Sequence, residues 1–193
     1  MSAILKNKRI LTVVQEATIS NSPLIIASDI HGSLEALEAL IDAAKAHRSA
    51  ALLFAGDLCP TDDPRFRTLL SALPTHLVSG NCDSSYGFSA AGIPYPPRFL
   101  LTESFGRKIL LTHGDFPFSA LDFGLEAGDI IATGHTHVPH LYTDSEGMIQ
   151  VNGGSVARPR SESGPTYALL FANRLAIHRL RDRRSLLSLA IKS

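Results

Sequence analysis

Two side chains that could bind a metal, Asp29 and His31, directly follow a short apolar segment near the start of the chain. The segment predicts a buried strand, and residues two apart on an extended chain point to the same side. A carboxylate oxygen and an imidazole nitrogen placed side by side are suitable ligands for a divalent cation. Because Asp-x-His also occurs by chance, the pair alone fits an ordinary polar strand end. A metal site requires further ligands from other parts of the chain.

Four later apolar segments also end in residues with ligand-type side chains. The segments span residues 51–55, 76–79, 108–112 and 129–133. The residues that follow them are Asp57, Asn81, His113, His135 and His137. With the first pair they provide two carboxylates, four imidazoles and one amide oxygen. This set is too large for one first-row cation with an open position, and it suits two cations that share a bridging ligand.

The elements between these segments predict how the ligands come together. Residues 34–45 and 64–73 carry apolar side chains at helical spacing, and Asp63 and Pro64 suit the start of the second helix. Alternation with the first three strands gives β-α-β-α-β, which predicts a mostly parallel sheet with flanking helices. Ligands bind beyond the carboxyl ends of strands in such sheets. We therefore expect one site at that edge.

The second half of the chain is less regular. Residues 83–97 predict a loop, which is either a lid or substrate wall or a packed surface loop. Residues 98–102 and 108–112 predict a hairpin, and 116–127 a short helix with a broken start. Further short strands with tight turns predict an antiparallel layer that forms much of a second sheet. They span residues 141–143, 148–151, 166–172, 175–180 and 186–191.

Composition indicates one ordinary globular domain. The chain has 193 residues, of which 45% are hydrophobic and 19% charged. Lys+Arg and Asp+Glu balance at 18 each, so no basic excess suggests nucleic acid or a membrane surface as a partner. No apolar segment is long enough to span a bilayer. The chain has two cysteines, Cys59 and Cys82, which are too few for a disulfide framework. A reducing cytoplasm is therefore the simplest location.

Residues 1–22 precede the first ligand-bearing strand and form a separate extension. Residues 10–14 predict a strand. A signal peptide is the alternative, but the apolar part is short and no clear cleavage pattern follows it. We prefer an extra strand or arm, followed by a single domain over residues 23–193.

The ordered motifs of this chain resemble those of the calcineurin-like metallophosphoesterase superfamily. They are Asp29-Ile-His31, Gly56-Asp57, Gly80-Asn81-Cys82-Asp83, His113-Gly114 and Gly134-His135-Thr136-His137. The Gly-Asn-Cys-Asp-Ser run and the later Asn-Gly-Gly-Ser-Val at 152–156 are similar to its small bacterial YfcE-type phosphodiesterases. The match covers residue 24 to the end. It implies an α/β fold, a four-layer α-β-β-α sandwich with mixed sheets and the metals at the sheet edge.

The resemblance also implies which residues hold two metals. The first would be bound by Asp29, His31 and His137, and the second by Asn81, His113 and His135. Asp57 would bridge them. Mn²⁺ is the activator that the family implies, and iron, zinc or nickel also suit these ligands. A water shared by two cations is acidified to hydroxide and attacks phosphorus in line. The implied reaction is hydrolysis of a small phosphodiester.

Two residues depart from the superfamily pattern. Cys82 stands where many members carry a histidine that protonates the leaving group. Because a thiol is a weak donor, we predict a preference for acidic leaving groups such as aryl esters. The alternative is that Cys82 is a small buried filler. Asp115 replaces the second histidine of His-Gly-His. Its carboxylate could hold a metal, act as an acid or disfavour phosphomonoesters, or it could point to solvent or cap the next helix.

Several further residues are candidates for support of the site. We expect Asn152 and Ser155 to bring the backbone close to the metals. Arg160 is the candidate for a forked contact with phosphate, and Arg158 competes with it. Asp83 is a candidate for orienting Cys82 or His113. Cys59 is interpreted as a packing residue.

Three functions fit these motifs. The first is a metal-dependent phosphodiesterase, with Asp57, Asn81, Cys82 and Asp83 as the catalytic candidates. The second is a phosphomonoesterase or nucleotide pyrophosphohydrolase with the same centre. The third is a protein-interaction scaffold, since the small subunit of the retromer coat resembles this fold with a degraded metal site. All seven ligand-type residues are present here, which favours an enzyme. The sequence is also compatible with a homo-oligomer.

Overall fold

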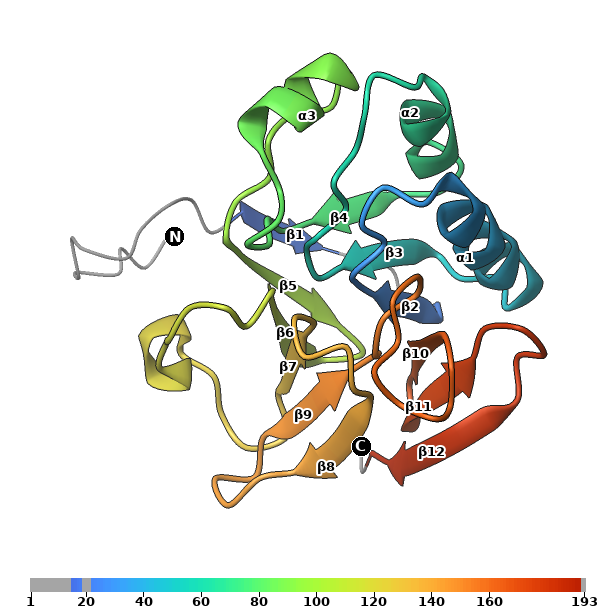
Figure 1. Ribbon diagram of the computed structural model, residues 1–193. Helices are drawn as coiled ribbons and strands as arrows, with labels where there is room; N and C mark the ends of the chain where they lie inside the picture. The colour runs from blue at the N-terminus through green and yellow to red at the C-terminus, as the bar shows by residue number, and fades with distance from the viewer. Residues whose placement is uncertain (1–14, 19–21, 192–193) are drawn as a thin grey trace.

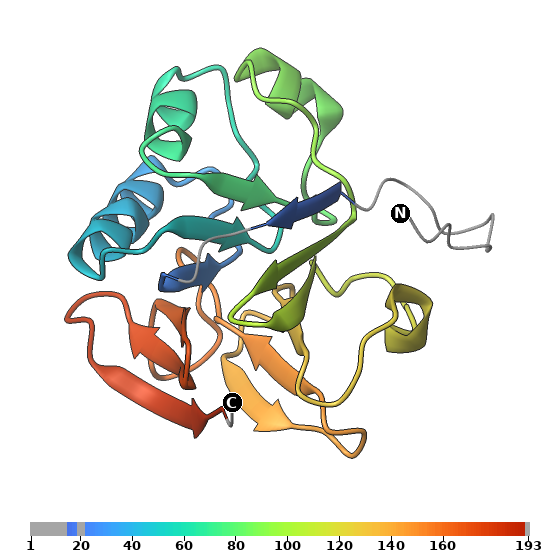
Figure 2. The ribbon, with the colours of Figure 1, turned by 180° about the vertical axis from the view of Figure 1, so that it is seen from behind.

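The computed structural model describes residues 15–18 and 22–191, which build two mixed sheets packed face to face (Figures 1 and 2). Sheet A contains, in spatial order, β1 (Gln15–Thr18), β5 (Phe99–Ser104), β6 (Arg107–Thr112), β7 (Ile130–Thr133), β9 (Ile149–Asn152) and β8 (His140–Thr143). Sheet B contains β12 (Ser185–Ala190), β11 (Arg174–Arg179), β10 (Thr166–Phe171), β2 (Leu24–Ala27), β3 (Ala51–Phe54) and β4 (Thr75–Leu77). Each sheet thus combines strands that are distant in sequence.

The predicted β-α-β-α-β unit is confirmed as one half of sheet B. Strands β2, β3 and β4 pair in parallel, connected by α1 (Leu34–Ala46) and α2 (Arg65–Leu70). Ser33 starts α1 by accepting the Ala36 N–H at 3.2 Å. Helix α2 is shorter than predicted, and Asp63 accepts the Arg65 N–H while Pro64 is the cap residue. Among the described residues no helix is long and apolar enough to cross a membrane.

Strands β2 and β3 of sheet B are buried on both faces. In β3, Leu53 joins the core between the two sheets, while Leu52 and Phe54 pack against the layer that contains α1 and α2. Ile25 and Ile26 of β2 divide between the two cores in the same way. This arrangement explains why these strands read as continuous apolar runs rather than as alternating patterns. The parallel strands are therefore fixed rigidly where their carboxyl ends carry polar residues.

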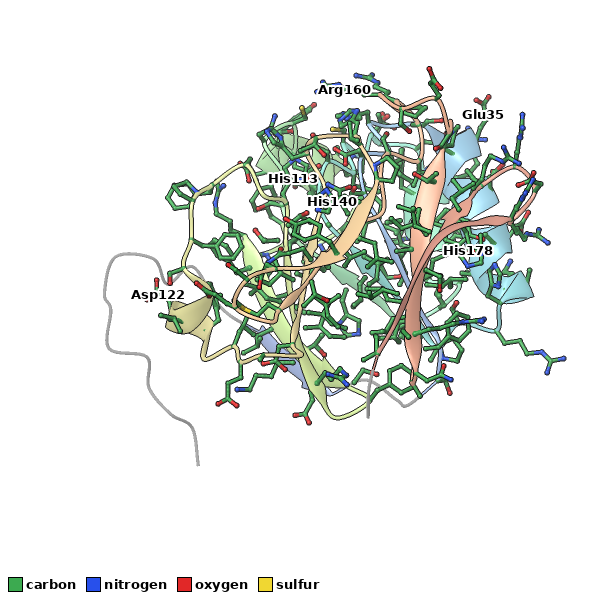
Figure 3. The ribbon with its side chains drawn as sticks, turned by 90° about the horizontal axis from the view of Figure 1, so that it is seen from below. Glu35, His113, Asp122, His140, Arg160 and His178 are labelled. Atoms are coloured by element: carbon green, nitrogen blue, oxygen red, sulfur yellow. The ribbon has the colours of Figure 1, made fainter. Side chains whose placement is uncertain are left out.

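The outer face of sheet A has a much smaller cover. A 3₁₀-helix η1 (Ala120–Phe123) packs Phe123 against Phe99, Ile131 and Met148. Figure 3 shows Asp122 of η1 and Glu35 of α1 on opposite sides of the molecule. The predicted α/β sandwich with two mixed sheets is confirmed. In the part of the chain that the structure describes, its fourth layer is this single turn and the adjoining loop.

Two local predictions are wrong. The helix predicted for 116–127 is only η1, which ends at Gly124 with a left-handed φ of 63°. The loop predicted for 83–97 contains helix α3 (Ser85–Ala90). Ser84 starts α3 by accepting the Gly87 N–H at 3.1 Å, and the buried Phe88 anchors it. The glycines and prolines of this segment favoured a loop prediction, and the Ser84 cap and the burial of Phe88 were not recognised from the sequence.

The predicted second antiparallel layer is also wrong in part. β8 and β9 belong to sheet A, where β9 pairs in parallel with β7. Only β10, β11 and β12 form the antiparallel part of sheet B, with β10 next to β2. Short strands carry no local signal for which sheet they join. The hairpin of β5 and β6 is confirmed. The strand predicted for 10–14 lies outside the described residues, and β1 pairs with β5 just after it.

A polar cluster fastens the end of α1 to sheet B. His47 Nε2 lies 2.8 Å from the hydroxyl of the fully buried Tyr167 on β10. The His47 and His178 rings are 5.4 Å apart, and His178 Nδ1 donates to Arg183 O at 2.8 Å. Burial, followed by the nearby His178 and Arg183, lowers the pKa of His47. Burial raises the pKa of Tyr167 to about 12, so its hydroxyl stays protonated and donates the hydrogen bond to a neutral His47.

We predict that this cluster makes the protein less stable in mild acid. The His47 pKa is lower in the folded state than its ordinary value of 6.5. The unfolded chain therefore binds a proton at His47 more readily than the folded protein does. The contribution of neutral His47 to folding stability is complete above pH 6.5 and is lost as pH falls through the lowered pKa. Urea unfolding of metal-free protein at pH 7.5 and 5.5 measures this loss. His47→Gln, which cannot titrate, should lose less stability than the wild type over that interval. An equal loss in both proteins would contradict the assignment.

Candidate metal centre

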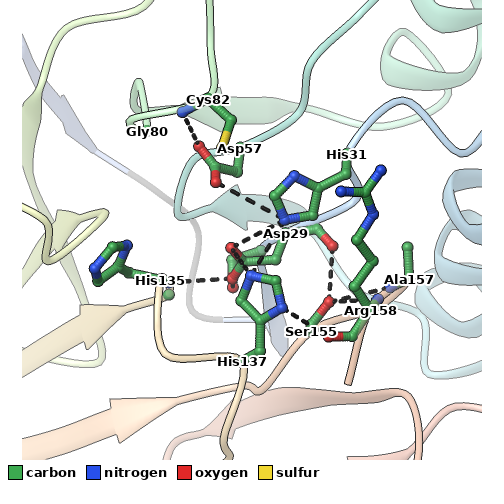
Figure 4. Close-up of polar contacts among 12 residues, drawn as sticks. Asp29, His31, Asp57, Gly80, Cys82, His135, His137, Ser155, Ala157 and Arg158 are labelled. Carbon is green, nitrogen blue, oxygen red and sulfur yellow. Dashed lines mark hydrogen bonds and ion pairs between the residues drawn. The ribbon is translucent and has the colours of Figure 1, made fainter. Parts of the chain in front are cut away.

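The seven ligand-type residues predicted from the sequence lie together at one edge of the two sheets. Asp29 and His31 follow β2, Asp57 follows β3 and Asn81 follows β4. His113 follows β6 of sheet A, and His135 and His137 follow β7. Figure 4 shows Asp29, His31, Asp57 and His137 facing one another, with His135 at the side of this group. The edge where sheet A meets sheet B therefore collects ligands from both.

The first group consists of Asp29, His31 and His137. The Nε2 atoms of the two histidines are 3.2 Å apart, and Asp29 Oδ1 lies 3.1 Å from His137 Nε2 and 3.8 Å from His31 Nε2. His137 Nδ1 donates to the Arg158 carbonyl at 2.7 Å, so its Nε2 is free to accept. Burial lowers the pKa of His31 despite the two nearby carboxylates, which keeps its ring neutral.

The spacing of this group fits a shared cation. Asp29 is fully buried, yet its Oδ1 has no hydrogen-bond partner among the described residues. A buried carboxylate oxygen without a partner is costly unless a cation compensates it. Ligand atoms about 2.1 Å from a tetrahedral ion lie about 3.4 Å from each other. The observed separations of 3.1 to 3.8 Å bracket this value.

The second group consists of Asn81, His113 and His135. Asn81 Oδ1 lies 3.1 Å from His113 Nε2 and 2.9 Å from His135 Nδ1. His113 Nδ1 donates to the Ala55 carbonyl at 2.7 Å, which directs its Nε2 toward the site. The Asn81 amide nitrogen points away, toward Cys82 Sγ at 3.3 Å. One oxygen and two ring nitrogens therefore face each other.

Asp57 lies between the two groups. Its Oδ1 accepts the Cys82 N–H at 2.8 Å, while Oδ2 lies 3.8 Å from His31 Nε2 and 3.4 Å from His113 Nε2. Burial would raise the pKa of Asp57, but the hydrogen bonds from His113 and Cys82 outweigh it and lower the pKa to about 2. Burial would likewise lower the pKa of His113, and its bonds to Asp57 and Ala55 raise it. The donor set and its spacing fit two divalent cations.

The loops that carry these ligands have an unusual backbone. Five of the ligands have left-handed φ angles, which are uncommon outside glycine. They are Asp29 (59°), His31 (47°), Asp57 (57°), His135 (66°) and His137 (61°). Gly134 allows the β7 loop to approach sheet B, since a Cβ there would lie 2.6 Å from Ser28 Oγ and 2.9 Å from the Ala55 carbonyl. The surrounding packing therefore stabilises strained loops at the site.

Asp83 holds two of these loops together, and it is not positioned as the sequence analysis expected. Its Oδ2 accepts the N–H groups of Asp57 and Gly80, both at 2.9 Å, and its Oδ1 accepts the Cys59 N–H at 2.7 Å. Neither Cys82 nor His113 is its partner in these bonds. Burial raises the pKa of Asp83, against the effect of the same hydrogen bonds. Asp83 thus acts on the site through the Asp57 backbone.

Asn152 and Ser155 connect further loops, as predicted for residues that bring the backbone near the site. Asn152 Nδ2 donates to the Gly134 carbonyl at 2.6 Å, and its Oδ1 accepts the Gly154 N–H at 2.8 Å. Ser155 Oγ donates to the Asp29 carbonyl at 2.9 Å and accepts the Arg158 N–H at 2.8 Å. The loop after β9 is therefore tied to the ligand loops of β2 and β7.

A cavity of about 320 Å³ opens above the two groups. It is lined by His31, Asp57, Asn81, Cys82, His135, His137, Arg158 and Arg160. Asp115 is absent from this lining, and its Oδ2 forms an ion pair with Arg98 at 2.9 Å. Arg98 also lies over the Phe116 ring at 5.2 Å. Of the alternatives for Asp115, this geometry supports neither a free solvent-facing carboxylate nor a group exposed in the cavity.

Two residues near the site were missed by the sequence analysis or interpreted differently. Ser28 Oγ donates to Asp29 Oδ2 at 2.5 Å and lies 3.1 Å from the Gly154 carbonyl, which orients the buried carboxylate. Cys59, interpreted as packing, lies beside His31 with Sγ 4.0 Å from Nδ1. Burial, then Asp83 and Asp57, raise the Cys59 pKa to about 12, so it stays a thiol. Its two-residue spacing from Asp57, which matches Asp29 and His31, was an available signal.

We predict that Asp83→Asn weakens both the fold and metal binding. An amide presents one oxygen to three backbone N–H groups, and each buried N–H left unpaired costs about 1–3 kcal/mol. Urea unfolding of the metal-free variant should show this loss, and calorimetric titration with Mn²⁺ should show weaker binding. Asp62→Asn, at an exposed position nearby, is the matched control and should behave as the wild type. A variant with wild-type stability would contradict the role of Asp83.

Comparison with known proteins agrees with this geometry. The sequence model described as calcineurin-like phosphoesterase superfamily domain matches residues 23–174. Phosphodiesterase YfcE of Escherichia coli K12 is 28% identical over 183 residues, which cover 87% of this chain and 97% of that protein.

Solved structures show the same relationship. A structure of the Escherichia coli phosphoesterase Yfce has a TM-score of 0.74 at 26% identity and covers 88% of this chain and 100% of that one. Vacuolar protein sorting 29 from Cryptosporidium parvum shares the fold, with a TM-score of 0.64 at 19% identity over 89% of this chain and 98% of that one. The family match extends over most of the chain and includes every residue of the two ligand groups. The chain therefore belongs to the calcineurin-like phosphoesterase superfamily and is a metal-dependent phosphoesterase.

Proposed function

We propose that this protein hydrolyses small phosphodiesters with two divalent cations, most simply Mn²⁺. The position of Asp57 Oδ2 between the two ligand groups carries this proposal, since this one carboxylate oxygen faces a histidine of each group. Iron, zinc or nickel are alternatives because the ligands mix nitrogen and oxygen atoms. The similarity to phosphodiesterase YfcE supports a diester as the substrate class.

The residues have separate roles in this proposal. Asp29, His31 and His137 would hold the first cation. Asn81, His113 and His135 would hold the second, and Asp57 would serve both. When bound, such a pair of cations supplies an activated water and offsets charge on the phosphoryl oxygens. Asp83, Asn152 and Ser155 keep the ligand loops in place through backbone contacts. Arg160 remains a candidate contact for phosphate, together with Arg158.

Cys82 supports a preference for good leaving groups. Its side chain is exposed in the cavity, so it is not a buried filler. Burial, followed by Asp57, raises its pKa, so the thiol keeps its proton at neutral pH. A thiol is a weak hydrogen-bond donor and protonates a departing alkoxide poorly. Esters whose leaving groups need no proton, such as aryl phosphodiesters, should therefore react best.

Other functions receive less support. A phosphomonoesterase or pyrophosphohydrolase would use the same centre, and the relative rates of monoester and diester cleavage decide between them. A protein-interaction scaffold would not require a complete ligand set. The similarity to vacuolar protein sorting 29 is below 25% identity and concerns the fold alone. A cytoplasmic location remains our prediction, and it suits two cysteines that are both free thiols.

The first test is hydrolysis of bis(4-nitrophenyl) phosphate and 4-nitrophenyl phosphate with added Mn²⁺. We expect faster cleavage of the diester and two bound metals by elemental analysis. Asp57→Asn removes the charge that both cations need, so diester activity should fall by about a hundredfold or more and metal content should fall with it. Asp62→Asn is the control for a carboxylate outside the site. Faster monoester cleavage, or full activity in Asp57→Asn, would refute the proposal.

The second test concerns the leaving group. Cys82→His introduces a stronger proton donor, and general acid catalysis is typically worth about a hundredfold or more. We expect kcat for a dialkyl phosphate to rise at least about tenfold while kcat for a bis-aryl phosphate changes little. Cys82→Ala is the matched control, because it removes the thiol without adding a donor. If dialkyl turnover is the same in all three proteins, Cys82 does not limit leaving-group protonation.

A further inference from the structure

Two arginine side chains line the cavity without a protein partner. Arg158 and Arg160 are exposed, and within residues 22–191 neither guanidinium forms a hydrogen bond or ion pair. Four other arginines among the described residues pair with carboxylates, namely Arg65 with Asp63, Arg98 with Asp115, and Arg179 and Arg181 with Asp182. The two cavity arginines therefore present uncompensated positive charge to whatever enters the site.

The backbone of both arginines is fixed to the ligand loops. The Arg158 carbonyl accepts His137 Nδ1 at 2.7 Å, and its N–H donates to Ser155 Oγ at 2.8 Å. Ser155 Oγ in turn donates to the Asp29 carbonyl. The Arg160 N–H donates to the His137 carbonyl at 3.1 Å. Their Cα positions are thus set relative to the ligands rather than by a free loop, which lowers the entropy cost of a side-chain contact.

Both side chains are exposed, and Arg158 lies beside one of the ligand-type residues. Figure 4 shows the Arg158 side chain extending beside His31, toward the ligand group. Burial lowers the pKa of His31, and the Arg158 charge acts in the same direction. Figure 3 shows Arg160 at the edge of the molecule. A molecule bound in the cavity would therefore meet Arg158 beside His31, and Arg160 lines the same cavity.

A phosphodiester alone does not balance the charge of this site. In the proposed function, two divalent cations and two arginines face three carboxylates, those of Asp29, Asp57 and Asp83. A singly charged diester and one hydroxide add two more negative charges, and an excess of positive charge still remains. A second anionic group on the substrate would neutralise this excess. Guanidinium groups bind phosphate through two parallel hydrogen bonds, which gives direction as well as charge.

We propose that Arg158, with Arg160 at the rim, forms an anion subsite for a second phosphate group of the substrate. The preferred substrate is then a phosphodiester that carries a further phosphate beside the scissile one. This inference rests on the proposed phosphodiesterase function. It adds a specificity residue, Arg158, whose role is binding rather than bond cleavage.

The test uses two esters with the same leaving group. Thymidine 5′-(4-nitrophenyl phosphate) and its 3′-phosphorylated form differ only by the second phosphate. With Mn²⁺ and wild-type protein, we expect kcat/KM to be about tenfold higher for the 3′-phosphorylated ester, as for one charge-assisted hydrogen bond. Arg158→Ala should abolish this advantage through KM, because it should lower kcat/KM about tenfold more for the 3′-phosphorylated ester than for the plain ester. Arg158→Lys should restore part of it.

Binding provides a readout that does not depend on turnover. Calorimetry on Mn²⁺-loaded protein should show thymidine 3′,5′-bisphosphate binding about tenfold more tightly than thymidine 5′-monophosphate. Arg158→Ala should remove this difference, and added salt should reduce it. Arg184→Ala, an exposed arginine in the turn before β12, is the matched control and should keep it.

The outcomes separate the two proposals. Equal affinity for the two nucleotides in the wild type, or equal effects of Arg158→Ala on both esters, would overturn the subsite. Diester hydrolysis in that case would leave the proposed function intact. No hydrolysis of either ester, together with an Arg158-dependent difference in binding, would support the subsite and overturn the phosphodiesterase function.

Discussion

The structure depends on the burial of two carboxylates, Asp29 and Asp57, beside the imidazoles of His31, His113 and His137. Each carboxylate has one oxygen bound by the protein and one oxygen directed at ring nitrogens. Asp29 Oδ2 is bonded by Ser28 and the His135 N–H, and Asp57 Oδ1 by the Cys82 N–H. The other oxygen of each faces histidines at 3.1 to 3.8 Å. Buried charge of this kind is costly unless it is compensated, and a pair of cations is the compensation that these ligands suit.

The core between the two sheets stabilises the loops that carry these buried carboxylates. Strands β2 and β3 are buried on both faces, so their carboxyl ends cannot shift to relieve the left-handed φ angles of the ligands that follow. Asp83 ties the loops after β3 and β4, and Ser155 ties the loops after β2 and β9. Ligand geometry is therefore set by backbone contacts that extend well beyond the ligands themselves.

A shared fold does not by itself assign chemistry. Vacuolar protein sorting 29 shares the fold at 19% identity, and that similarity by itself says nothing about catalysis. What assigns chemistry here is the position of particular atoms, above all Asp57 Oδ2 between the two ligand groups. Two further features lie near these atoms: Asp115 is paired with Arg98, and Arg158 lines the cavity without an ion-pair partner among the described residues.

The sequence by itself determined the parallel β-α-β-α-β unit and the seven ligand-type residues, because apolar strands that end in polar residues are local patterns. The two-residue spacings of Asp29 with His31 and His135 with His137 are equally local. Only the tertiary structure decided that β9 joins β7, that residues 85–90 form a helix, and that Asp83 bonds the Asp57 loop. It also placed Arg158 beside His31. These outcomes depend on contacts between segments far apart in the chain, for which short strands, capped turns and single polar side chains carry no local signal.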